Sequence, residues 1–400
     1  MATTFKNFLS NDIAQTRTLL HESIPITGSI VSGTYGTLTT DLSLDTNIKS
    51  YGHGMFSSVY DYPYLSSSAN QIFDITVGLS ADSNAYTATT QQKAKKLNIY
   101  NQMAQYLVGY DHTGSIKRFK LPAVGATPEK QMDDCYFIPF SRLLVKDEIK
   151  KGSFSFEFSV SGSDATPSFV ENQGVDYFAD RIKLTDASGS NGYFVDSPAG
   201  EYGVLFGTSS GPVGHAAYLE GETAGNSLTN PMVGLIYYQA GIMVMTGSVF
   251  QKSNHDNGPG LLDSATYNAG AVTSDPKIVN LGDVTSIGFY HAVTGATIAN
   301  LADGLRNRIK NISFNNTTEL NSTIYFCRVA HNDFNYSSNP TYLNGSKLRV
   351  KNRASDTPVS YITTVGLYSA DNELLAVAKL SEPLRKDPTN EITLRVRLDY

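Results

Sequence analysis

The stretch that decides the fold class is Ser153-Phe154-Ser155-Phe156-Glu157-Phe158-Ser159-Val160. Because successive side chains of a β-strand point to opposite faces, this alternation places Phe154, Phe156, Phe158 and Val160 on one face. Shorter strand-like stretches occur on both sides of it, at residues 29–32, 71–77, 136–138, 203–207, 234–238, 242–246 and 321–329. The sequence therefore predicts a protein built largely from β-strands.

Two hairpins are predicted from the residues between neighbouring strands. Gly241 separates 234–238 from 242–246 and is suited to a tight turn. Further along, Ser369-Ala370-Asp371-Asn372 separates the strand-like stretches 361–368 and 373–380 and has the composition of a turn. A last alternating strand is predicted at 392–400.

Three helices are expected among these strands. Residues 12–21 place Ile13, Thr16 and Leu20 at helical spacing, with Pro25 after them. Residues 91–108 show the same three- and four-residue steps and are followed by Gly109, and residues 300–308 suggest a short helix.

The expected fold class is a β-rich α+β protein with antiparallel sheets or sandwich-like domains, a few helices and an extended C-terminal arm. The arm is assigned to residues 331–342, which are polar, dotted with aromatic residues and without a regular period. Three domains are predicted: an α+β domain at 1–160, a β-rich domain at 161–310 that is rich in Gly, Ser and Asn, and a C-terminal strand, arm and hairpin at 311–400.

The composition favours a protein whose surface is covered by partners. Charged residues make up 17% of the 400 residues, against roughly a quarter in ordinary globular proteins. The net charge of −6 argues against a nucleic-acid-binding surface. The longest basic cluster, residues 93–96, is interpreted as a short solvated surface.

Targeting and redox signals are sparse. The sequence shows no basic segment followed by an apolar run at its start and no uninterrupted run of 18 apolar residues, so we expect no secretion signal and no membrane insertion. Cys135 and Cys327 are far apart and suggest two buried, reduced thiols rather than a disulfide framework. Synthesis in a cytoplasm follows from both expectations.

No convincing set of catalytic residues is found, so we expect no enzyme activity, no cofactor and no metal. The seven histidines are scattered singly. Gly207-Thr208-Ser209-Ser210-Gly211 matches the letters of a nucleophile elbow, but the Gly- and Pro-rich residues that follow are poor helix formers, which favours an ordinary turn. The neighbouring carboxylates 133–134 and 147–148 should point to opposite faces of a strand.

A tyrosine-rich tract at residues 51–64 has two interpretations. Tyrosine is frequent at interface hot spots, which would make Tyr60, Tyr62 and Tyr64 part of a binding surface. The same side chains also pack well at the edge of a core with the hydroxyl group at the surface. The sequence leaves both interpretations open.

Four stretches carry a resemblance to a known family. Residues 361–381, with Gly366-Leu367-Tyr368 and the run Glu373 to Leu380, resemble a hairpin module of phage tail and baseplate proteins. Residues 19–28, 59–70 and 140–152 are similar to virion structural proteins of T4-like tailed bacteriophages, notably those that infect marine cyanobacteria. These stretches bracket nearly the whole chain.

The resemblance implies a structural component of a tailed-phage virion, in the contractile-tail baseplate or the tail-fibre attachment region, assembled in the host cytoplasm. Its partners would be further copies of itself and other virion proteins. A neck, collar or capsid-associated protein and a receptor-binding or glycan-degrading tail protein are the alternatives. The expected interface residues are Tyr60, Tyr62, Tyr64, Phe334, Tyr336, Tyr342, Leu367, Tyr368, Leu374 and Leu375.

Overall fold

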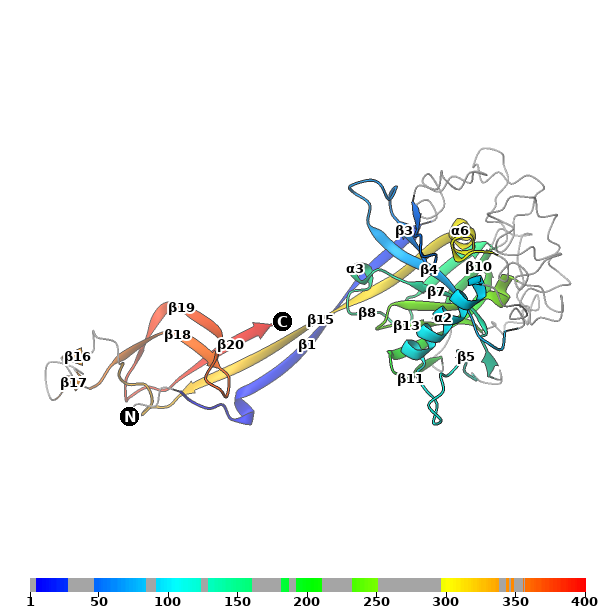
Figure 1. Cartoon of the computed structure of the whole chain (residues 1–400). Helices are drawn as coiled ribbons and strands as arrows, with labels where there is room; N and C mark the ends of the chain where they lie inside the picture. Colours follow the sequence, from blue (N-terminus) through cyan, green and yellow to red (C-terminus); the bar gives the residue numbers. More distant parts are fainter. Residues whose placement is uncertain are drawn as a thin grey trace. The chain divides into compact units, whose positions relative to one another are not determined.

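The structure is a computed structural model that describes residues 5–27, 47–83, 91–123, 129–159, 181–186, 192–210, 232–250, 296–337, 343–344, 347–348, 355 and 357–400. Most of these residues form β-strands in antiparallel sheets, joined by turns and a few helices (Figure 1). The prediction of a β-rich α+β fold is confirmed. Among the described helices, none has the length and apolar character needed to cross a bilayer.

The chain divides into two compact units. The terminal unit comprises Met1–Leu20 and Glu319–Tyr400, and the central unit comprises His21–Thr318. Two long strands, β1 (Ile13–Thr27) and β15 (Ile309–Val329), contribute residues to both units. This division differs from the three predicted domains, because strands from 1–160 and 161–310 are interleaved in one sheet.

The large antiparallel sheet continues from β1 and β15 through the central unit. Its further strands, in spatial order, are β9 (Ser155–Ser159), β10 (Arg181–Thr185), β12 (Gly200–Ser210), β13 (Met232–Tyr237), β14 (Ile242–Thr246), β7 (Asp134–Pro139), β4 (Gln71–Leu79), β3 (Ser57–Tyr60) and β2 (Ile48–Ser50). Two short strands, β8 (Glu148–Ile149) and β11 (Tyr193–Ser197), pair alongside β15 and β12.

Strand β9 is the stretch from which the fold class was predicted. Phe154, Phe156 and Phe158 are all buried, as the alternation required, whereas Val160 lies outside the described residues. The predicted hairpin of β13 and β14 is also confirmed, with Gly241 at φ 65° in its turn. The strand predicted at 29–32 lies outside the described residues.

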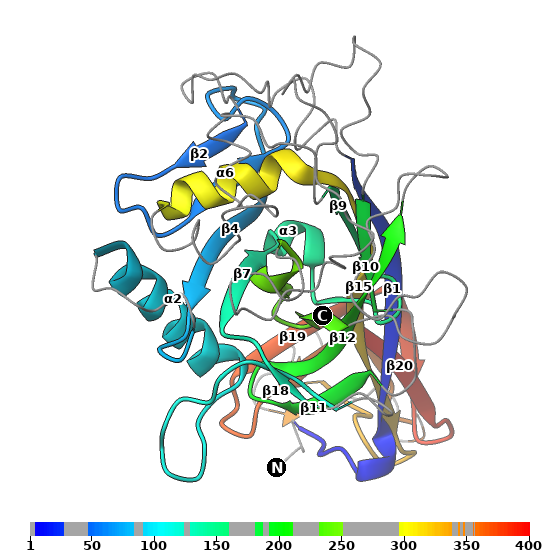
Figure 2. The same cartoon turned by 90° about the vertical axis from the view of Figure 1, so that its right-hand side faces the viewer.

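Within the central unit, this sheet has buried residues on both of its faces. Along β7, Tyr136 belongs to one hydrophobic cluster and Phe137 to the other, and neighbouring residues of a strand point to opposite faces. The predicted helix at 91–108 is α2 (Gln91–Leu107), and the one at 300–308 is α6 (Ile298–Arg308). Helix α2 contributes Tyr100 to one cluster and α6 contributes Leu305 to the other, so the two helices cover opposite faces beside β4 (Figure 2).

Helix α2 packs closely against strand β4 at Gly78. A Cβ atom at this position would lie 2.9 Å from the Cα atom of Tyr100 and 2.8 Å from the ring of Phe137. Only glycine therefore lets α2 pack this tightly on β4. The hydroxyl group of Tyr100 then donates to the carbonyl oxygen of Met132 at 2.7 Å, which ties the helix to the chain leading into β7.

Short elements complete the two units. In the central unit they are α3 (Arg142–Val145), the 3-10 turn η3 (Gly247–Phe250) and the hairpin β5 (Lys120–Leu121) with β6 (Lys130–Gln131). In the terminal unit they are the 3-10 turn η1 (Ser10–Asp12) and the hairpin β16 (Leu343–Asn344) with β17 (Lys347–Leu348).

The main strands of the terminal unit are the predicted C-terminal ones. Strands β18 (Ser360–Tyr368) and β19 (Leu374–Lys386) form the expected hairpin, with Asn372 at φ 63° in the turn. The last strand, β20 (Ile392–Asp399), pairs with β15 from Ser322↔Asp399 to Val329↔Ile392 without a register shift. Strand β20 confirms the strand that was predicted at 392–400.

The helix predicted for residues 12–21 is wrong, because these residues form the beginning of β1. Ile13 and Leu20 match a helical spacing, yet both are exposed, so no apolar stripe packs against a core. Strand β15 supplies backbone partners instead, and ion pairs join Arg17 to Glu319 and Asp12 to Arg328. Pro25 is tolerated because β1 is the first strand of the sheet, where one edge needs no donor.

Two further expectations about single residues are corrected. Lys93 and Lys96 are buried rather than solvated, and the Lys96 ammonium group donates to the carbonyl oxygen of Ala296 at 2.7 Å. Burial, followed by the charge of Lys93, lowers the pKa of Lys96 to about 8. Both cysteines are free thiols, but only Cys135 is fully buried, whereas Cys327 is half-buried.

The arm expected at 331–342 is not extended in its described part. Residues 331–337 form turns and bends that fold back onto the end of β19. Lys386 and Asn335 are the buried residues that hold this loop in place. Residues 338–342 lie outside the described residues.

Candidate functional site

The two units differ sharply in how much apolar surface they bury. Among the described residues, the buried apolar side chains of the terminal unit are Ile324 and Val329, and all the other buried apolar side chains belong to the central unit. A β-layer is stabilised by packing its apolar face against another layer. The terminal unit therefore has apolar faces that its own residues cover only in part.

The exposed large apolar residues show the same imbalance. Most of those described lie in the terminal unit, at Phe5, Leu9, Ile13, Leu19, Leu20, Leu320, Tyr336, Tyr361, Tyr368, Leu374, Leu375, Val377 and Tyr400. On β19, Leu375 and Val377 are 62% and 57% exposed and share one face of the strand. Such a concentration of apolar surface is typical of an interaction site.

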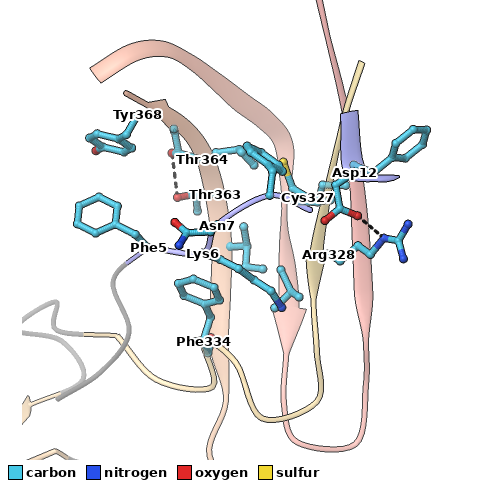
Figure 3. A pocket seen from close by; sticks show the side chains of 18 of the residues that line it. Phe5, Lys6, Asn7, Asp12, Cys327, Arg328, Phe334, Thr363, Thr364 and Tyr368 are labelled. Atoms are coloured by element: carbon cyan, nitrogen blue, oxygen red, sulfur yellow. Dashed lines mark hydrogen bonds and ion pairs between the residues drawn. The ribbon is translucent and has the colours of Figure 1, made fainter. Parts of the chain in front are cut away.

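A groove of about 580 Å³ lies within the terminal unit (Figure 3). Its walls are residues 5–8, residues 326–329 near the end of β15, and residues 360–366 of β18. Seven consecutive residues of β18 line the groove, so the groove follows this strand for most of its length. Strand β18 pairs only with β19 among the described residues, which leaves one of its edges without a ladder partner.

Aromatic rings line much of the groove. The ring of Phe5 packs edge-on against that of Tyr368, with centroids 5.0 Å apart, and Figure 3 shows both at one end of the groove. Phe8 packs on Tyr325 with centroids 5.3 Å apart. Phe334 is a further aromatic lining residue. The groove can therefore hold an apolar segment in contact with several rings.

The charged groups at the groove are paired with one another. The ammonium group of Lys6 lies 2.6 Å from a carboxylate oxygen of Asp333, and this hydrogen bond holds the pKa of Asp333 below its usual range. Asp12 and Arg328 form an ion pair of 2.8 Å at the other end. Burial and the charge of Asp12 raise the pKa of the Cys327 thiol. The remaining lining residues of β18 are uncharged.

The loop that presents Phe334 is held by buried hydrogen bonds. Phe334 has φ 52°, a left-handed conformation that costs a non-glycine residue about 1–2 kcal/mol. Its carbonyl oxygen accepts a hydrogen bond from the hydroxyl group of Ser360 on β18. The ammonium group of Lys386 donates to Asn335 Oδ1 at 2.7 Å and to the carbonyl oxygen of His331 at 3.1 Å. These bonds offset the strain and fix the groove wall.

The structure brings together some of the predicted interface residues and separates others. Phe334, Tyr336 and Tyr368 line the groove, while Leu374 and Leu375 are exposed on the adjoining hairpin strand. Leu367 is half-buried on β18. Tyr342 lies outside the described residues.

The tyrosines of the 51–64 tract belong to the central unit and not to the groove. Tyr62 is exposed, whereas Tyr60 and Tyr64 are half-buried with ring centroids 6.4 Å apart. Burial raises the pKa of Tyr60 to about 12. Tyr60 and Tyr64 therefore match the core-edge interpretation better than the interface interpretation.

Nothing in the sequence indicates that Phe5, Lys6 and Phe8 belong to the same site as β18. They lie more than 300 positions from Asp333 and Tyr368 in the sequence. The available signal was local: two aromatic residues and a leucine within five positions, at Phe5, Phe8 and Leu9, ahead of a strand.

The titratable groups of the central unit serve packing. Asp186 accepts hydrogen bonds from the backbone amides of Gly152 and Phe154 and from the hydroxyl group of Tyr238, at 2.7, 3.0 and 2.8 Å. Burial raises the pKa of Asp186 despite these bonds.

Ser209 lies inside β12, where it is paired with Ile182. It is therefore not on a turn after a strand, which corrects the turn expected there.

Neighbouring carboxylates do not form an acid–base pair. Asp133 contacts Arg118 and Ser80, while Asp134 accepts a hydrogen bond from Ser83. Within the described ranges, no group of three or more His, Cys, Asp and Glu side chains is placed to hold a metal ion.

Comparisons with protein-family models, with curated proteins and with solved structures found no match to this chain.

Proposed function

We propose that this chain is a structural component of a tailed-phage virion, in the contractile-tail baseplate or the tail-fibre attachment region, and that it acts through contacts of its terminal unit with other subunits. The observation that carries the proposal is the exposure of apolar side chains along β18 and β19 of the terminal unit. Among the described residues of this unit, only two apolar side chains, Ile324 and Val329, are buried. The sequence resemblance supports the assignment to a virion.

The energetic reason is the cost of leaving these faces in water. Complete burial of one Leu, Val or Phe side chain contributes about 1.5–3 kcal/mol. Leu374, Leu375 and Val377 alone therefore represent several such contributions that the isolated chain does not obtain. An interface with another subunit recovers them, which is the physical basis for assembly.

The central unit has the properties of a stable scaffold in this scheme. Its sheet is covered on both faces and includes the phenylalanines of β9 and the buried Tyr237 of β13. The terminal unit is then the part that binds, supported by a folded core that needs no partner. This division separates stability from recognition.

The proposal is tested by replacing exposed apolar residues of each unit with serine. The Leu375→Ser/Val377→Ser double variant changes the face of β19, and the matched control Leu143→Ser/Val195→Ser changes residues that are 76% and 74% exposed in the central unit. Each is supplied in trans to a phage that lacks its own copy, and mass spectrometry measures the amount of the chain in purified particles.

We expect the β19 variant to be incorporated at least about tenfold less than the natural chain, because 1.4 kcal/mol already corresponds to a factor of ten. The control variant should be incorporated normally. Thermal unfolding of both purified proteins verifies that the exposed substitutions leave the fold intact. Absence of the natural chain from particles, or equal incorporation of both variants, would contradict the proposal.

A further inference from the structure

One edge of β18 is an unused site for strand addition, because among the described residues this strand pairs only with β19. Residues 360–366 all line the groove, and no described strand pairs with this edge. An exposed strand edge presents a row of backbone amide and carbonyl groups that can pair with another extended segment. From Ser360 to Tyr368 the strand contains no charged residue and no proline to prevent such pairing.

The segment of residues 5–9 lies against this groove without completing it. Phe5 contacts Tyr368 and Lys6 contacts Asp333, so its side chains already match the groove. Its backbone is not part of a strand, and within the described residues no backbone–backbone hydrogen bond joins residues 5–8 to β18. Phe5 and Leu9 stay 47% and 69% exposed.

We propose that the 5–9 segment of one copy adds as a β-strand to the free edge of β18 in a neighbouring copy. This inference rests on the proposed function and names the partner of the terminal unit as a second copy of this chain. Exchange of an identical element between copies keeps the side-chain contacts that the segment makes within one chain. Strand addition supplies the backbone hydrogen bonds that those contacts leave unmade.

Charge favours β18 over β20 as the acceptor. The segment carries one charge, that of Lys6, and its partner Asp333 stands beside the groove. On β20 the exposed residues include Arg395 and Arg397, which would oppose Lys6 and would also oppose each other if two copies of β20 paired. The uncharged edge of β18 presents no such repulsion.

The base of the segment is suited to act as a hinge. Turn η1 ends at Asp12, whose carboxylate is held by Arg328, so the chain is anchored directly after the segment. Within the turn, the amide of Asp12 donates to the carbonyl oxygen of Leu9 at 2.9 Å. Five extended residues span at most about 18 Å. The acceptor groove of the neighbouring copy must therefore lie within that distance of the hinge.

Cross-linking between two differently labelled chains tests the exchange. One chain carries Phe5→Cys and the other carries Tyr368→Cys with a mass tag, both in a Cys327→Ser background because Cys327 lines the groove. The two full-length proteins are mixed, allowed to assemble and treated with a short bismaleimide. An exchanged segment places these two cysteines side by side on different chains, whereas an unexchanged segment pairs position 5 with position 368 of its own chain.

We expect the mixed, tagged dimer to exceed the dimer formed by either variant alone by at least about tenfold, since docking raises the local concentration of the reacting pair. A control mixture uses Ser50→Cys and Ser57→Cys, whose hydroxyl groups lie 3.1 Å apart within one central unit. It should give no mixed dimer, although both substitutions in one chain should link within that chain.

The outcomes separate this inference from the proposed function. If the protein forms oligomers and enters particles, but a chain with both Phe5→Cys and Tyr368→Cys links only to itself, the strand exchange is wrong and the proposed function stands. If the protein is monomeric at every concentration and absent from particles, both proposals are wrong. A mixed dimer that equals the background of the single variants also overturns the exchange.

Discussion

The ammonium group of Lys386 lies 2.7 Å from the amide oxygen of Asn335, and the lysine side chain is fully buried. The same nitrogen donates to the carbonyl oxygens of His331 and Asp387 at 3.1 and 2.8 Å. One cation thus joins the end of β19 to the loop that presents Phe334. The groove wall depends on a polar contact between residues that are 51 positions apart in the sequence.

Replacement of this lysine should loosen the loop. Lys386→Met leaves buried carbonyl acceptors without a donor, and each such group costs about 1–3 kcal/mol. We expect the opening free energy of residues 331–337, measured by hydrogen exchange, to fall by about 2–4 kcal/mol. Lys379→Met, on the exposed part of the same strand, is the control and should change it by less than about 0.5 kcal/mol. Equal effects of the two variants would refute the role of Lys386.

Gly78 should tolerate no side chain. Gly78→Ala places a Cβ atom 2.9 Å from the Cα atom of Tyr100, so α2 must move away from the sheet. Overpacking of this kind costs about 1–3 kcal/mol in the free energy of unfolding. Gly52→Ala is the control, because nothing lies within 4 Å of the added atom. Urea denaturation that gives both variants the same midpoint would contradict the tight packing.

Asp134 should make the central unit less stable as the pH rises. Burial raises the pKa of Asp134 to about 7, well above its ordinary value of 3.8. Between these two values the unfolded chain has lost the proton that the folded chain keeps, so the folded state binds more protons and its stability falls with increasing pH. The decrease is complete above pH 7 and amounts to at most about 4 kcal/mol.

The measurement for Asp134 compares the natural chain with Asp134→Asn between pH 4 and pH 8. The asparagine can still accept the hydrogen bond from Ser83, but it does not titrate. The difference in unfolding free energy between the two proteins should grow with pH in favour of the variant. A difference that is constant over this range would show that Asp134 titrates normally.

The buried ion pair of α6 should be sensitive to the loss of one partner. Arg306 and Asp303 lie 3.0 Å apart with exposed fractions of 0% and 6%, and Arg306 also donates to the amide oxygen of Asn47. Arg306→Met leaves the carboxylate of Asp303 buried without its cation, which costs about 3–5 kcal/mol. Arg142→Met, at an exposed position, should cost less than about 0.5 kcal/mol. Urea denaturation measures both, and a small effect of Arg306→Met would contradict the buried pair.

The success of sequence-based prediction depended on whether local pattern and tertiary pairing agreed. Strand β9 was predicted because its alternation of apolar and polar residues is typical of a strand. Helix α2 was predicted because Tyr100, Ala104 and Leu107 recur at helical spacing, and the structure buries all three. At residues 12–21 the spacing of apolar residues suggested a helix, but pairing with β15 decided the conformation. Local periodicity alone cannot report such a partner, which lies about 300 positions away.

Long, polar strands were also beyond prediction. Only residues 321–329 of β15 were assigned to a strand, whereas the structure begins it at Ile309. The missed part contains Asn315, Asn316 and Thr317, which favour loops when judged by composition. Asn316 instead uses its amide group to bind the carbonyl oxygen of Leu144 at 2.8 Å, a contact that appears only after folding.

The groove was predictable in part. Phe334 and Tyr336 were expected at an interface as part of the C-terminal arm, and Tyr368 as part of the hairpin that carries the resemblance; all three line the groove. Its other wall, with Phe5 and Phe8, comes from the opposite end of the sequence. Nothing in either segment by itself indicates that they meet.

Hydroxyl-radical footprinting of the chain, free in solution and within purified particles, tests the central claim most directly. The claim predicts that modification of Leu374, Leu375 and Val377, all exposed in the isolated chain, falls at least about fivefold in the particle, because a packed interface excludes water. Unchanged modification of these three residues in the particle would contradict it.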